Sequence, residues 1–149
     1  MDKRIFIIIF IIFIVLASAF VIYNQTHVKV GEYYFEVPNG YDVINNDSFI
    51  NLTNNQRFIC LKCYNNDSAD MLVKNYVHIK EAKNFSVDIS NYDLDGVNVT
   101  KTDINGRNVT QHYWFNLNGK TYEFFKEEGD FNADYIVYDL IKSRTKLFV

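Results

Sequence analysis

The longest run of apolar positions in the chain covers residues 5–23, which carry no charge and directly follow Lys3 and Arg4. At about 1.5 Å per residue, a helix over this run spans about 28 Å, close to the hydrocarbon core of a bilayer. Because the basic residues precede the run, we expect residues 1–4 to stay cytoplasmic and residues 24–149 to be extracytoplasmic. The pattern therefore predicts a single-pass signal-anchor helix that contacts membrane lipid.

A cleaved signal peptide is the alternative. Ala17-Ser18-Ala19 matches the small-residue pattern of a cleavage site, and cleavage following Ala19 would release a secreted domain. Against cleavage, apolar residues continue past this site to Tyr23, where an interfacial aromatic residue is expected. We favour the anchor.

Beyond residue 24, short apolar runs separated by Gly, Asn, Asp and Pro predict strands. The first block of predicted strands covers residues 27–30, 33–37, 41–44, 49–53 and 57–64, and the second covers residues 85–89, 97–102, 108–117 and 120–127.

Helical periodicity occurs in two further segments. Residues 68–83 form the first predicted helix, capped by Asp67 or Ser68, and residues 130–144 form the second, capped by Asp130. Two helices among many strands favour an α+β fold, a twisted antiparallel sheet with the helices packed on one face.

The strongest local signal is Asn118-Gly119, which is typical of a type I′ hairpin turn. This turn pairs Phe115 with Tyr122 and Tyr113 with Phe124, and we expect these pairs to face the core. The opposite face of the hairpin is then predicted to point outward; it carries Asn108, Thr110, His112, Trp114, Glu123 and Phe125.

The order of these elements resembles the PsbP-like fold of small extracytoplasmic accessory proteins. The segments that carry the resemblance are residues 34–41 (YFEVPNGY), 104–106 (ING) and 118–122 (NGKTY). It covers nearly all of residues 27–144 and rests on turn and packing positions. The resemblance implies an accessory or scaffold role, sometimes with metal binding, but no ligand motif of the family matches here.

Composition and charge limit the number of domains and the classes of partner that we expect. The part after the anchor, about 126 residues, is enough for one domain. A net charge of -3 without a Lys/Arg cluster argues against a nucleic-acid partner. Acceptor sequons for glycosylation, which an Asn-rich composition could also produce, occur at Asn24, Asn46, Asn51, Asn66, Asn84, Asn98 and Asn108.

One acidic segment resembles half of a calcium loop. Asn91, Asp93 and Asp95 offer oxygen ligands at alternate positions before Gly96, but Thr102 stands where an EF-hand has its bidentate Glu. A tight turn between strands explains the same residues without metal. No other cofactor is predicted.

Cys60 and Cys63 form a CxxC pair in a predicted strand. Strand residues three apart point to opposite faces, about 10 Å from each other, so a disulfide between them requires a bulge or a strand end. A redox motif would place the first Cys at a helix N-terminus instead.

The predicted outward residues His112, Trp114 and Phe125 are the candidate contact for a surface or membrane protein partner. The alternative is that the helix over residues 68–83, or the N-terminal hairpin, covers them. Since the sequence contains no catalytic motif, we do not expect an enzyme. We expect a membrane-anchored binding or accessory module. The second hypothesis is a small-ligand or metal-ion (Ca) sensing domain that uses the acidic loop around Asp93 and Asp95.

Overall fold

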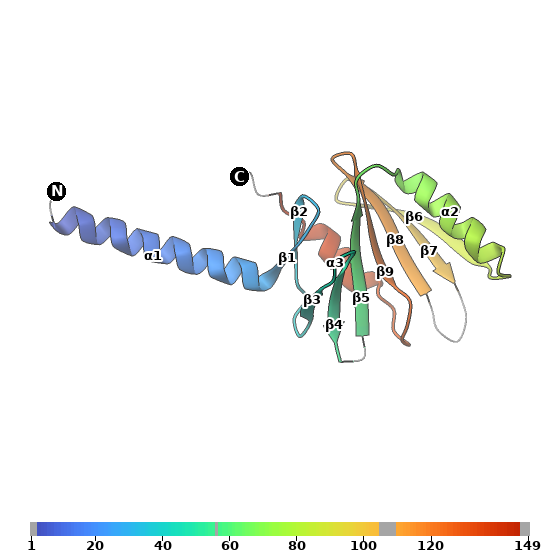
Figure 1. Ribbon diagram of the computed structural model, residues 1–149, viewed down its shortest axis with the longest axis horizontal. Helices are drawn as coiled ribbons and strands as arrows, with labels where there is room; N and C mark the ends of the chain where they lie inside the picture. The colour runs from blue at the N-terminus through green and yellow to red at the C-terminus, as the bar shows by residue number, and fades with distance from the viewer. Residues whose placement is uncertain (1–2, 56, 105–109, 147–149) are drawn as a thin grey trace.

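The computed structural model describes residues 3–55, 57–104 and 110–146, which form three helices and nine strands (Figure 1). In chain order the elements are α1 (Lys3–Thr26), β1 (His27–Val30), β2 (Tyr33–Glu36), β3 (Asp42–Asn45), β4 (Ile50–Asn54), β5 (Arg57–Tyr64), α2 (Ala69–Glu81), β6 (Val87–Leu94), β7 (Val97–Ile104), β8 (Thr110–Leu117), β9 (Lys120–Lys126) and α3 (Asp134–Lys142). Apart from β6 and α3, the predicted strands and the helix over residues 68–83 agree with these bounds to within about two residues.

Seven of the strands form one antiparallel sheet in the order β3-β4-β5-β9-β8-β7-β6, and β1 and β2 form a separate hairpin. The α+β class is therefore confirmed. The register predicted from the Asn118-Gly119 turn is also confirmed: Phe115 lies opposite Tyr122, and Leu117 lies opposite Lys120. Both turn residues have positive φ, 49° and 75°, as a type I′ turn requires.

The two domain helices lie on opposite faces of the sheet, so the prediction that both share one face is wrong. Alternate residues of β8 show the two faces: Tyr113 and Phe115 belong to the core cluster that contains α3, whereas Trp114 packs with α2. The α3 face is the larger core, because the β1–β2 hairpin also packs on it through Val28 and Phe35.

Helix α3 begins at Asp134, so the predicted N-cap at Asp130 is wrong. The N-cap residue, Ala133, makes no side-chain cap. Two other side chains replace it: Asn132 Oδ1 accepts a hydrogen bond from Asp134 N at 2.8 Å, and Gln111 Oε1 accepts one from Ala133 N at 2.8 Å. The second of these comes from β8 and is invisible to local sequence patterns.

Helix α1 extends away from the domain, on the side where the β1–β2 hairpin lies, while α2 lies on the far side (Figure 1). Residues Arg4–Thr26 are long and apolar enough to cross a membrane, and none of that span is buried against the domain. A membrane anchor and a signal sequence share these properties.

Candidate functional site

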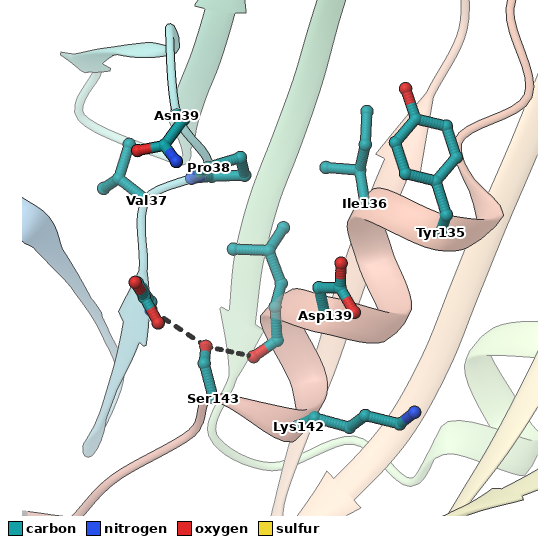
Figure 2. Close-up of a pocket in the computed structure, with 10 residues that line it drawn as sticks. Val37, Pro38, Asn39, Tyr135, Ile136, Asp139, Lys142 and Ser143 are labelled. Atoms are coloured by element: carbon teal, nitrogen blue, oxygen red, sulfur yellow. Dashed lines mark hydrogen bonds between the residues drawn. The ribbon is translucent and has the colours of Figure 1, made fainter.

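A groove of about 510 Å³ lies between α3 and the segment that follows β2 (Figure 2). Its lining residues are Glu36, Val37, Pro38, Asn39, Tyr135, Ile136, Asp139, Leu140, Lys142 and Ser143. The two walls are about a hundred residues apart in the sequence, which is why the sequence pattern did not indicate a site here.

Backbone and hydroxyl hydrogen bonds hold the two walls together. Glu36 N donates to Ser143 Oγ at 2.9 Å, and Ser143 Oγ donates to Leu140 O at 2.8 Å (Figure 2). Val37 N donates to Thr26 O at 2.8 Å, which links the groove to the last residue of α1. One edge of the groove, at Val37, therefore lies next to the end of the apolar helix.

The groove combines an apolar floor with a polar rim. Ile136 and Leu140 are buried, whereas Tyr135 is 58% exposed and its hydroxyl accepts a hydrogen bond from Arg57 Nη1 at 3.3 Å. Asp139 is exposed on the rim. An apolar floor with a few polar groups suits binding of a protein segment or a small ligand.

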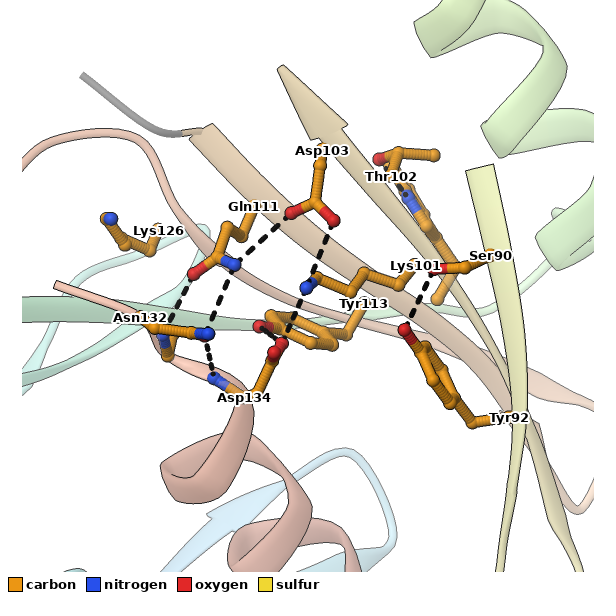
Figure 3. A network of polar contacts seen from close by, with 12 residues as sticks. Ser90, Tyr92, Lys101, Thr102, Asp103, Gln111, Tyr113, Lys126, Asn132 and Asp134 are labelled. Carbon is orange, nitrogen blue, oxygen red and sulfur yellow. Dashed lines mark hydrogen bonds and ion pairs between the residues drawn. The ribbon is translucent and has the colours of Figure 1, made fainter. Parts of the chain in front are cut away.

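A polar network joins β7 and β8 to the start of α3 (Figure 3). Lys101 Nζ lies 3.0 Å from Asp103 Oδ2 and 2.7 Å from Asp134 Oδ1, and the Tyr113 hydroxyl donates to Asp134 Oδ1 at 2.6 Å. Burial alone would raise the pKa of Asp134, but hydrogen bonds from Lys101, Tyr113 and Asn132 outweigh it and leave that pKa below its usual value.

Gln111 completes this network from β8. Its Nε2 donates to Asp103 Oδ1 at 3.2 Å and to Asn132 Oδ1 at 3.3 Å (Figure 3). Nearby, the fully buried Lys126 donates to the carbonyl of Phe131, and burial lowers its pKa. Because these groups hold one another and the N-terminus of α3, the network explains the position of that helix rather than a reaction.

The predicted partner contact His112, Trp114 and Phe125 is not an exposed surface. His112 and Trp114 are each 3% exposed, and Tyr76 of α2 lies over them, its ring centroid 4.3 Å from that of His112. The expectation of an outward face is therefore wrong for His112 and Trp114, and the alternative that the helix over residues 68–83 covers them is confirmed, whereas Phe125 is half-buried and stacks on His112.

Under α2, His112 belongs to a hydrogen-bonded cluster with Glu123 and Tyr64. His112 Nδ1 lies 2.6 Å from Glu123 Oε1, and the Tyr64 hydroxyl donates to Glu123 Oε2 at 2.5 Å. Among the described side chains, His112 Nε2 and the Tyr76 hydroxyl are buried without a hydrogen-bond partner. Burial, and then the hydrogen bond to Glu123, raise the pKa of Tyr64.

The predicted calcium residues Asn91 and Asp93 belong to β6, and Asp95 lies in the turn before β7. Asn91 Oδ1 accepts a hydrogen bond from Thr100 Oγ1 at 2.9 Å, and Asp93 Oδ1 accepts one from Gly96 N at 3.2 Å. The segment is a hairpin, not an independent loop, and the predicted strand end at residue 89 is too early. Within the described ranges, no three His, Cys, Asp or Glu side chains cluster as a metal site would require.

Cys60 and Cys63 are free thiols on opposite faces of β5, so the disulfide that would require a bulge or a strand end is not formed. Cys60 Sγ donates to Asn51 Oδ1 at 2.9 Å, and burial raises the Cys60 pKa to about 11. A thiol with that pKa carries little thiolate at neutral pH, which argues against redox chemistry at this position.

The sequon asparagines remain predicted glycosylation sites. Asn24, Asn46, Asn66, Asn84 and Asn98 are exposed, and Asn51 is half-buried. Asn108 lies outside the described residues. The same is true of residues 105 and 106, which belong to the segment 104–106 that carried part of the resemblance.

The fold resembles known structures, although no family model matches the chain and no curated protein matches it. The solution structure of cyanobacterial PsbP (CyanoP) from Synechocystis aligns with a TM-score of 0.54 and 11% identity, covering 78% of this chain and 87% of that one. A crystal structure of a Bacteroides thetaiotaomicron protein aligns with a TM-score of 0.49 and 8% identity, covering 78% of this chain and 46% of that one. The chain thus has a PsbP-like fold, as the sequence resemblance predicted.

Proposed function

We propose that the protein is a membrane-anchored accessory module that binds a protein partner of the same membrane through the groove between α3 and residues 36–39. The observation that carries this proposal is the hydrogen bond from Val37 N to Thr26 O, 2.8 Å long, at the end of the helix that could cross the membrane. A groove in that position is within reach of a partner that emerges from the same bilayer.

Three further features support the proposal. The PsbP-like resemblance implies an accessory role. The groove offers an apolar floor beneath a rim with the exposed Tyr135 and Asp139, and exposed aromatic side chains are common at protein interfaces. None of the described sequon asparagines lines the groove.

We further propose that residues 1–4 lie in the cytoplasm, because Lys3 and Arg4 precede the apolar helix. Cleavage after Ala19 is the competing hypothesis. The mass of the protein recovered from its native membranes distinguishes the two, since cleavage removes nineteen residues.

Photo-crosslinking tests whether a partner binds in the groove. A benzophenone amino acid replaces Tyr135 in the full-length protein, and the matched control carries it at the exposed Lys74 of α2. After irradiation in native membranes, we expect an adduct with one membrane protein from position 135 and none from position 74. Asp139→Ala is expected to weaken this adduct severalfold. Identical adducts from both positions, or none from position 135, would overturn the proposal.

A further inference from the structure

The β1–β2 hairpin has two different faces. Val28 and Val30 are buried against the core, opposite Phe35 and Tyr33. The other face points away from the sheet; its residues are His27, Lys29, Tyr34 and Glu36. This set, called here the outer hairpin face, mixes aromatic, basic and acidic groups.

Helix α1 ends on the outer hairpin face without a linker, because α1 ends at Thr26 and β1 begins at His27. The Tyr23 ring stacks on His27 with centroids 3.8 Å apart and lies 5.7 Å from the Tyr34 ring. These ring contacts fix the direction in which α1 leaves the hairpin.

The C-terminal segment closes this junction. The Tyr23 hydroxyl lies 2.9 Å from Thr145 Oγ1, and Thr145 exchanges two backbone hydrogen bonds with Tyr34, of 2.8 Å and 2.9 Å. With the bond between Val37 N and Thr26 O, the end of α1 is attached to both strands of the hairpin and to the chain after α3. The described residues of this junction therefore hold the end of α1 through several contacts.

The bilayer then lies beside the outer hairpin face. The 24 residues of α1 span about 36 Å, somewhat more than a hydrocarbon core of about 30 Å, so Tyr23 falls at the interface where tyrosine is enriched. Tyr34 contacts Tyr23, and Lys29 Nζ lies 5.7 Å from the centre of the Tyr34 ring. Tyrosine and lysine together are suited to the headgroup region, where the ring and alkyl chain meet lipid and the polar tips meet water or phosphate.

We infer that the outer hairpin face, with Thr145, rests on the phospholipid headgroups and holds the domain in one orientation on the membrane surface. The inference rests on the anchor in the proposed function. It places the groove edge at Val37 near the bilayer and α2 at the far side of the domain, consistent with the arrangement in Figure 1.

Energy transfer to the bilayer surface tests this orientation. The full chain, with both native cysteines replaced by serine, is reconstituted in phosphatidylcholine nanodiscs that contain a headgroup-labelled acceptor lipid. A donor fluorophore is attached to Lys29→Cys, and the matched control carries it on Lys74→Cys of α2; both lysines are exposed. The fluorescence of the single tryptophan confirms that each variant is folded.

We expect transfer from position 29 to exceed transfer from position 74 severalfold. Equal transfer from the two positions would overturn the inference, because the outer hairpin face would then lie no closer to the lipid than α2 does. Alkaline carbonate washing separates this failure from failure of the anchor: a chain that stays in the membrane while transfer is equal refutes only the orientation, whereas a chain released by carbonate refutes the anchor itself.

Discussion

Replacing Lys101 with methionine removes the cation that bridges Asp103 and Asp134, at 3.0 Å and 2.7 Å. The Lys101 side chain is 7% exposed, and the two carboxylates are 21% and 30% exposed. Breaking a buried ion pair from one side typically costs about 3–5 kcal/mol. Because water reaches both carboxylates here, we expect a loss at or below the lower limit of that range, about 2–3 kcal/mol of unfolding free energy.

The pH dependence of this stability loss is a second, independent test of the ion pair between Lys101 and Asp134. The pKa of Asp134 is lowered in the folded protein, so its stabilising contribution is present above the unfolded pKa and is lost as the pH falls through the folded pKa. Without Lys101 the part of this contribution that Lys101 supplies is absent, while the hydrogen bonds from Tyr113 and Asn132 remain. The stability difference between the wild-type protein and Lys101→Met should therefore shrink as the pH falls below about 4.

The assay is urea unfolding of the full chain in detergent, followed by the fluorescence of Trp114, which is the single tryptophan and is buried. Lys74→Met, on the exposed side of α2, is the control and should change stability by no more than about 0.5 kcal/mol. A Lys101→Met loss equal to that of the control, or one that does not vary between neutral and acidic pH, would refute the reasoning.

Three further predictions use the same unfolding assay or thiol chemistry. Tyr76→Phe removes a buried hydroxyl without a partner and should be neutral or stabilising, whereas Tyr64→Phe loses a 2.5 Å hydrogen bond to a buried carboxylate and should cost about 1–3 kcal/mol; the reverse order would contradict the cluster geometry. Gly31→Ala should destabilise more than Gly96→Ala. Both have positive φ, but a Cβ at the first would lie 2.6 Å from a thiol sulfur and at the second meets nothing within 4 Å, so equal losses of stability would be unexpected. Alkylation of Cys60 should be slow at pH 7 and accelerate as the pH approaches about 11; fast labelling at neutral pH, measured by mass spectrometry, would exclude the buried thiol described here.

The sequence predicted the local elements well where a residue type has a local effect. Asn118-Gly119 fixes a two-residue turn, and the register of β8 and β9 follows from it without further information. Ser68 caps α2 as expected, with its Oγ accepting a hydrogen bond from Met71 N at 3.3 Å. These features depend on neighbours in the chain, so a single sequence contains the relevant information.

Features that depend on residues far apart in the chain could not be predicted from local sequence patterns. The side-chain cap of α3 comes partly from Gln111, more than twenty residues away. The polar residues 90–93 suggested a loop, but they belong to β6, an edge strand of the sheet, where polar and charged side chains are well tolerated. The groove requires residues 36–39 and α3 to meet, and no local pattern indicates that contact.

One sequence signal indicated that the Trp114 face of β8 is covered by a second layer. In β8, five consecutive residues from Gln111 to Phe115 are buried, which means that both faces of this strand are covered. An antiparallel strand with one solvated face alternates between apolar and polar side chains, but here Trp114 lies between the apolar Tyr113 and Phe115. The aromatic residue on the supposedly outward face was therefore evidence for a second layer rather than for an interface.

The two layers differ in how firmly they are attached, and this difference bears on where the protein can bind. Helix α3 buries four apolar side chains from its own span and is tied to the sheet by the Lys101–Asp134 network, whereas α2 buries two and leaves two polar atoms beneath it unpartnered among the described residues. Few buried apolar contacts mark the regions of a protein that open locally at low cost. A binding groove gains affinity when its walls are rigid before the partner arrives. By these criteria the α3 side is the more firmly attached side of the domain, and it is also the side attached to α1. Both features favour the groove at α3 over the face under α2 as the proposed binding surface.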